Sequence, residues 1–174
     1  MAGMKGKQTV RDMVLSLGVI VLVAFFIYLF IPHDDSQTPL KRVDYRVELL
    51  TARRAAPYPV AAPQGLPKEW KPTSVRYQGA EHNAWHLGFH TADGQYVAIE
   101  QSTDKPSDFI EQKSQGAEKT KVTQQIGDQT WQRYEGPKYD ALVFEGDGYT
   151  TVVTGTGSFG QLTKMASALK TEAP

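Results

Sequence analysis

The sequence predicts one α+β domain that follows a single membrane-spanning helix. Three observations indicate this: an uncharged apolar run near the start, strand-like segments separated by turns over residues 73–154, and an amphipathic segment over residues 158–170. Strand-like and helical segments are partly segregated rather than strictly alternating. This order favours a mostly antiparallel sheet, with the C-terminal helix packed on it, over a parallel, doubly wound sheet.

The apolar run begins at Met13, ends at Ile31 and contains no charged side chain. A helix of that length reaches about 28 Å, close to the ~30 Å hydrocarbon core of a bilayer. A cleaved signal peptide is the alternative, but its apolar region is about 7 to 15 residues long and precedes a small-residue cleavage site, which is absent here. We therefore expect a retained single-pass anchor in the cell membrane.

The flanks of the run predict its orientation. Basic residues precede it, namely Lys5, Lys7 and Arg11, whereas Asp34 and Asp35 follow it. Cytoplasmic flanks are enriched in Lys and Arg. We expect residues 1–12 to be a cytoplasmic tail, residues 32–42 a polar stalk, and residues 43–174 an extracytoplasmic domain.

Composition limits the classes of function. The formal net charge is zero, which argues against a nucleic-acid partner. The chain contains no cysteine, so neither a disulfide framework nor a lipid-modified cysteine is possible. Stability must therefore come from an ordinary hydrophobic core.

The start of the domain combines an ambiguous segment with a proline-rich one. Residues 43–49 alternate like a strand, but residues 48–56 are rich in helix formers, so we favour a helix capped by Asp44. Residues 57–72 hold five of the ten prolines. We expect an extended strap across the surface, with Leu66 and Trp70 inserted in the core. A proline-rich ligand for another protein is the alternative.

One hairpin can be registered from its pattern. Apolar residues alternate over residues 85–89, and a turn at Asp93 and Gly94 precedes an apolar run over residues 96–99. A two-residue loop would pair Leu87 with a glutamate. A three-residue loop, with Gly94 in the left-handed conformation, pairs Leu87 with Ile99 and Phe89 with Val97. We prefer this second register because it keeps the apolar side chains together.

The remaining elements follow from turns and periodicity. Further strands are predicted over residues 73–77, 119–125, 130–135, 141–145 and 149–154. A short helix is predicted over residues 106–114, and a longer one over residues 158–170. Ser158 and Gln161 form a capping-box pattern at the start of the longer helix.

Three histidines, His82, His86 and His90, are spaced by four residues. On a strand this spacing covers about 13 Å, so no single zinc ion can bridge them. A partner strand could supply an acid such as Glu100. A solvated polar sheet face is nevertheless the preferred interpretation, and no metal site is predicted.

Two further motifs are explained by turns. Residues 155–160 match G-x-G-x-x-G, but the chain leaves no room for the second parallel strand and the acid that a dinucleotide site needs. We interpret them as a flexible turn between a strand and a helix. Acidic residues also lie in predicted turns, namely Asp93, Asp104, Asp140, Glu145 and Asp147. Turns favour aspartate for local hydrogen bonding, so we prefer this interpretation to a catalytic carboxylate pair.

Aromatic residues in the predicted sheet, Trp131, Tyr134, Tyr139 and Tyr149, could line a binding groove or form cross-strand pairs. We prefer the cross-strand interpretation. No catalytic, cofactor-binding or metal-binding residue is assigned.

Four segments, in order after one N-terminal span, carry a family resemblance: residues 63–77 (PQGLPKEWKPTSVRY), 83–102, 127–134 and 150–170. Together they resemble the single-pass actinobacterial membrane proteins grouped as domain of unknown function 4245. The resemblance implies a cell-membrane location and a sheet with a terminal helix. It implies no assigned activity and no functional residues.

We therefore expect a non-enzymatic, membrane-tethered module that binds an envelope protein or a small ligand outside the membrane. The alternatives are an envelope hydrolase that uses turn carboxylates, and an accessory subunit of a larger membrane complex. No cofactor is expected.

Overall fold

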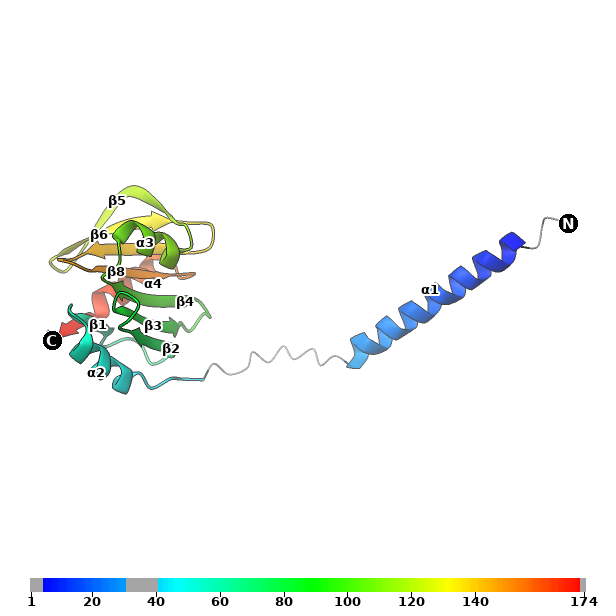
Figure 1. Ribbon diagram of the computed structural model, residues 1–174, viewed down its shortest axis with the longest axis horizontal. Coiled ribbons are helices and arrows are strands. Elements are labelled where there is room, and N and C mark those ends of the chain that lie inside the picture. Colours follow the sequence, from blue (N-terminus) through cyan, green and yellow to red (C-terminus); the bar gives the residue numbers. More distant parts are fainter. Residues whose placement is uncertain (1–4, 31–40, 173–174) are drawn as a thin grey trace. The chain divides into compact units, whose positions relative to one another are not determined.

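A computed structural model of the protein describes residues 5–30 and 41–172 (Figure 1). The chain divides into two compact units, residues 1–39 and residues 40–174. The predicted end of the span at Ile31 and most of the predicted stalk lie outside the described residues.

The described part of the first unit, residues 5–30, is one helix, α1 (Lys5–Phe30). Within it the window Val10–Tyr28 has a mean hydropathy of 2.3, and none of the window is buried. Its length and composition are sufficient to cross a membrane, as a membrane anchor or as a signal sequence. The helix begins before the predicted span. Residues 5–12 include lysine, arginine and glutamine, which are good helix formers, so the helix extends through them.

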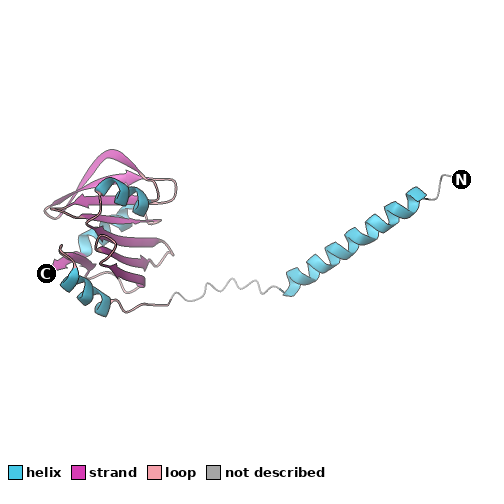
Figure 2. Ribbon diagram, in the orientation of Figure 1, coloured by secondary structure: helices cyan, strands magenta, loops and turns pink. Residues whose placement is uncertain are grey.

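The second unit is an α+β domain built on a seven-stranded sheet (Figures 1 and 2). Its strand order is β2-β3-β4-β8-β7-β6-β5, and every pair of neighbours is antiparallel. The strands are β2 (Lys71–Gln78), β3 (Ala84–His90), β4 (Tyr96–Ser102), β5 (Glu118–Ile126), β6 (Gln129–Glu135), β7 (Asp140–Glu145) and β8 (Thr150–Gly155). The predicted fold class is confirmed.

The β3–β4 hairpin has the register that the sequence predicts. Leu87 pairs with Ile99 and Phe89 pairs with Val97. Gly94 has a φ of 77°, in the left-handed region that the three-residue loop requires. The same register places His86 opposite Glu100.

Three helices belong to the domain: α2 (Arg46–Ala55), α3 (Pro106–Ser114) and α4 (Phe159–Ala168). The helix preferred for residues 43–56 is confirmed, but its N-cap is Tyr45 rather than Asp44. The Asp44 carboxylate instead accepts the backbone N–H of Arg46 at 3.1 Å. The capping box of α4 is present, with Ser158 accepting from the backbone N–H of Gln161.

A second sheet corrects two expectations. Strand β1 (Val60–Pro63) pairs with β9 (Leu169–Glu172), and all four residues of β1 are buried. The proline-rich segment is therefore packed and partly a strand, not a strap on the surface. The final helix also ends at Ala168, because the chain then turns into β9.

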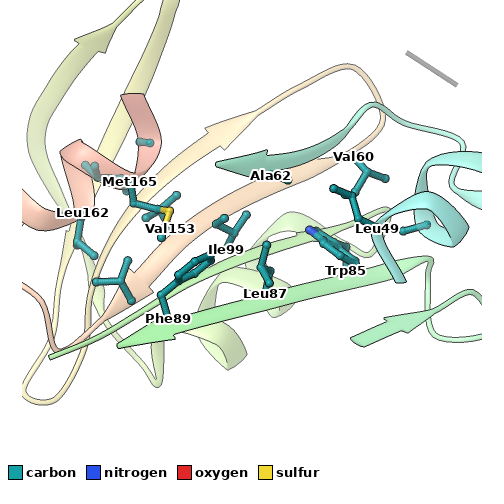
Figure 3. Packing of buried hydrophobic residues seen from close by; sticks show 14 of the residues in the cluster. Leu49, Val60, Ala62, Trp85, Leu87, Phe89, Ile99, Val153, Leu162 and Met165 are labelled. Carbon is teal, nitrogen blue, oxygen red and sulfur yellow. The ribbon is translucent and has the colours of Figure 1, made fainter. Parts of the chain in front are cut away.

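The two faces of the seven-stranded sheet are covered differently. The core face carries the larger apolar cluster, which joins the sheet to α2, α4 and β1 (Figure 3). Trp70 belongs to this cluster and Leu66 packs against it, as predicted. On the second face α3 covers β7 and β8 with a smaller cluster that includes Phe109 and Ile110.

The turn from β8 into α4 requires glycine at Gly155. A Cβ at Gly155 would lie 2.0 Å from the backbone oxygen of Tyr96. The glycine-rich segment thus acts as the strand-to-helix turn that the sequence predicts, where one glycine permits a close approach of two strands.

Candidate functional site

The three histidines have different surroundings in the structure. His90 Nδ1 lies 3.1 Å from the hydroxyl of Thr73, and His82 Nε2 lies 3.9 Å from a carboxylate oxygen of Asp104. Only His86 contacts the acid named from the sequence, Glu100. Among the described residues, no group of three or more histidines and acids is arranged to hold a metal ion.

His86 is the centre of a hydrogen-bonded series on the second face. Its Nε2 lies 2.8 Å from Ser74 Oγ on β2, and its Nδ1 lies 2.6 Å from Glu100 Oε1 on β4. Glu100 Oε2 lies 3.2 Å from Nζ of Lys113, in the last turn of α3. Tyr96 on β4 is hydrogen-bonded to Ser74 at the other end. We call these five residues the polar relay.

Glu100 determines which groups of the relay donate hydrogen bonds and which accept them. Glu100 is paired with the ammonium group of Lys113 and its side chain is only 8% exposed. An ionised carboxylate can only accept, so a neutral His86 carries its hydrogen on Nδ1. Its Nε2 is then left as the acceptor for the hydroxyl of Ser74. The relay therefore has a single direction of donation towards the carboxylate.

The glycine at position 88 leaves space for the relay, because it has no side chain. A Cβ at Gly88 would lie 2.4 Å from Ser74 Oγ and 2.5 Å from the phenol oxygen of Tyr96. The two hydroxyl groups thus converge over Gly88, between β2 and β4. Burial raises the pKa of Tyr96 to about 12, while the hydrogen bond with Ser74 acts in the opposite direction. Tyr96 therefore remains a protonated donor at neutral pH.

A small pocket opens beside the relay. It has a volume of about 240 Å³ and is lined by residues of β2, β3, β4 and α3: Arg76, Gln78, Ala84, His86, Glu100 and Lys113. The guanidinium of Arg76 contacts the amide of Gln78 at 3.5 Å and forms no ion pair with an acid of the described residues. The positive charge of Lys113, in contrast, is paired with Glu100.

A larger groove lies on the core side of the domain, between the β5–β6 turn, α4 and β9. Its volume is about 570 Å³. The ring-bearing residues in its lining are Trp131, Phe144 and Tyr149. Uncharged polar residues make up much of the rest: Gln101, Gln125, Gln129, Thr151, Thr163, Ser167 and Thr171. We call this site the groove.

Aromatic contacts hold the rings of the groove in place. Trp131 and Phe144 lie on adjacent strands with ring centroids 5.7 Å apart. Tyr149 stacks on Tyr58 at 5.3 Å with an interplanar angle of 14°. The indole Nε1 of Trp131 is buried and has no hydrogen-bond acceptor among the described residues. A bound group can supply that acceptor only if neighbouring side chains move, because Nε1 is shielded from solvent.

Two of the acids predicted in turns, Asp104 and Glu145, line the same small pocket of about 230 Å³, which Lys105 also lines. Asp93 accepts from Thr91 at 2.5 Å and from Gln161. Asp140 accepts the backbone N–H of Gly136 at 3.2 Å, and Asp104 accepts that of Lys105. Apart from the bond that Asp93 accepts from Gln161 on α4, these are the local turn bonds expected of aspartate. Of the four aromatic candidates, Trp131 and Tyr149 line the groove, while Tyr134 packs against the smaller cluster.

Sequence reasoning found part of the relay and missed the rest. The predicted hairpin register already placed His86 opposite Glu100, which was a usable signal. Ser74 could not be aligned, because the β2–β3 register shifts between Pro72 and Ser74. Lys113 lies within the predicted helix over residues 106–114, but nothing in the pattern placed it over β4.

Comparison with known proteins identifies a family whose members resemble this chain. The sequence profile of a family described as "Protein of unknown function (DUF4245)" matches residues 5–169. No curated protein matches the chain. Among solved structures, a GTP-binding regulator from Thermotoga maritima is similar at 12% identity, with a TM-score of 0.38. That match covers 57% of this chain and 76% of the other.

Proposed function

The chain belongs to the DUF4245 family of proteins of unknown function, so its activity must be inferred from its own geometry. We propose that it is a membrane-anchored domain that binds an uncharged, hydroxyl- and amide-bearing ligand in the groove, outside the cytoplasm. Oligosaccharide is the ligand class that we propose.

The anchor proposal rests on α1. Its apolar window is unburied, and 19 residues are long enough to cross a bilayer. The basic residues before the window and the acidic residues after it favour a cytoplasmic N-terminus. A retained anchor would hold the domain at the outer surface of the membrane.

The groove carries the binding proposal. Its volume of about 570 Å³ falls within the ~300 to 1,000 Å³ that is common for ligand sites. The half-buried rings of Phe144 and Tyr149 can contact an apolar face of a ligand, while amides and hydroxyls of the lining can exchange hydrogen bonds with it. Among the described residues of the lining, only Asp128 and Lys170 bring charge. This combination suits a neutral sugar better than a strongly charged ligand.

Calorimetric titration of the full chain in detergent with a soluble N-acetylated disaccharide tests the proposal. Ser167 is exposed on α4 and lines the groove, so Ser167→Trp should fill it without disturbing the core. We expect binding to weaken at least tenfold. The matched control is Lys164→Trp, an exposed position on the same helix outside the groove, which should bind like the native chain. Unchanged binding by Ser167→Trp, or no binding by the native chain, would contradict the proposal.

Protease treatment of intact cells tests the orientation. We expect the domain to be digested from outside, while a tag on residues 1–12 is cut only after lysis. The reverse pattern would show that the domain is cytoplasmic.

A further inference from the structure

The polar relay lies on the second face of the sheet, whereas the groove lies on the core side, so ligand binding in the groove leaves the relay unused. Its order is hydroxyl, imidazole, carboxylate, with 2.8 Å and 2.6 Å between successive partners. This order is the one that activates a serine for attack on a carbonyl carbon, whichever fold carries it.

We infer that Ser74, His86 and Glu100 form a nucleophile, a base and an orienting acid that hydrolyse a carboxylic ester. This second activity departs from the expectation, drawn from the sequence, that the chain is not an enzyme. It is independent of the ligand proposed for the groove.

The proton inventory of the reaction is complete with water as the co-reactant. Ser74 Oγ forms a bond to the ester carbonyl carbon while His86 Nε2 takes the hydroxyl proton. The carbon–oxygen bond to the alcohol then breaks, and the alcohol leaves with the proton from His86. Water attacks the acyl carbon while His86 Nε2 takes one of its protons. The bond between that carbon and Ser74 Oγ then breaks, and His86 returns the proton to Ser74 Oγ as the carboxylic acid leaves. Glu100 keeps the imidazole in the required tautomer throughout.

Tyr96 can stabilise the charge that develops on the carbonyl oxygen. Its phenol converges with Ser74 Oγ over Gly88, so it lies beside the attacking atom. Burial keeps the phenol protonated, and a protonated hydroxyl is a donor to an oxyanion. Only glycine at position 88 leaves the space in which the two hydroxyl groups meet.

The neighbouring pocket points to an anionic ester. Arg76 brings a positive charge that no described acid neutralises, and His86 and Glu100 line the same pocket. A carboxylate on the substrate can therefore pair with Arg76 while its ester group approaches Ser74. The substrate class is a small ester that carries a carboxylate near its carbonyl group.

The alternative is that the relay only satisfies the buried carboxylate of Glu100. A purely structural network explains the hydrogen bonds of Glu100, but it requires no reactivity of Ser74. A covalent probe separates the two, because labelling depends on nucleophilicity and not on stability.

The first test uses the full native chain in detergent. A fluorophosphonate probe should label Ser74, as located by mass spectrometry of the tryptic peptides. Labelling should fall at least tenfold in His86→Gln, which removes the base. Absence of label on Ser74 in the folded native chain would overturn the inference, and this test needs no variant that might fail to fold.

The second test follows hydrolysis of the 4-nitrophenyl monoester of succinic acid. Ser74→Ala should lower kcat at least 100-fold, whereas Ser107→Ala, an exposed serine of α3, should not change it. Arg76→Met should raise KM at least fivefold for this ester and leave KM for neutral 4-nitrophenyl butyrate unchanged. Equal hydrolysis by the native chain and a folded Ser74→Ala variant, or no hydrolysis by the native chain, would overturn the inference.

Discussion

The two faces of the seven-stranded sheet are made by alternate residues of the same strands, yet they differ in chemistry. On β3, Trp85 is fully buried on the core face and donates its indole N–H to Ala61 at 3.0 Å. The next residue, His86, lies on the second face between Ser74 and Glu100. The apolar face fixes the strands, and rigid strands hold polar groups at set distances. The core face therefore supplies most of the stability, and the second face can hold reactive polar groups.

The largest expected loss of stability comes from removing a large side chain from the core face. Trp85→Ala should lower the free energy of unfolding by about 3 to 5 kcal/mol, since it leaves a large cavity. Urea unfolding followed by near-ultraviolet circular dichroism measures the loss. Arg76→Ala, at an exposed position of the second face, should stay within about 0.5 kcal/mol of the native chain. Equal losses in both variants would show that the faces do not differ in this way.

A change in the relay should have a smaller effect on stability. Glu100→Ala leaves Lys113 and the Nδ1–H of His86 without their acceptor, at a cost of about 2 kcal/mol. Solvent offsets part of this cost because the side chain of Lys113 is 28% exposed. Adding Lys113→Met should restore some of the lost stability, because the unpaired ammonium is then absent. If the double variant is no more stable than Glu100→Ala, the ion pair is not part of the cost.

Alkaline pH should lower the stability that Tyr96 contributes on the second face. Burial raises its pKa in the folded protein to about 12, above the ordinary value of 10.0. The protonated phenol therefore contributes stability that is complete below pH 10 and is lost as pH rises from 10 towards 12. Tyr96→Phe cannot titrate, so its stability should fall less between pH 9.5 and 11.5 in urea titrations. A parallel decline of both proteins would contradict this assignment.

The smallest effect concerns the helix that covers the core face. Gly160 is exposed in α4, and a Cβ there meets only Ser158 Oγ, at 3.7 Å. Gly160→Ala should therefore raise the unfolding free energy by about 0.5 to 1 kcal/mol, because alanine favours helix. Thermal melting should show a small rise in Tm. A fall would mean that the start of α4 needs the freedom of glycine.

Local patterns account for what the sequence could predict. Alternation and a glycine turn were enough for the β3–β4 register, and a capping box located the start of α4 at Ser158. Pairing between distant segments was not predictable, so the partnership of β1 with β9 was missed. The prolines around β1 also argued against a strand.

The candidate sites were predictable only where one hairpin contains them. His86 and Glu100 share such a hairpin, whereas Ser74 enters across a bulge and Lys113 comes from a separate helix. The groove collects residues from many elements, including the ends of α4 and β9. No sequence periodicity predicts which elements will line the groove together, because that depends on how the elements pack after they form.

The pairing of β1 with β9 also bears on how the domain assembles. Val60 has Glu172 as its partner, so the first strand of the domain cannot pair until nearly all of the domain has been synthesised. Closing such a distant contact costs considerable chain entropy, and we expect this step late in folding.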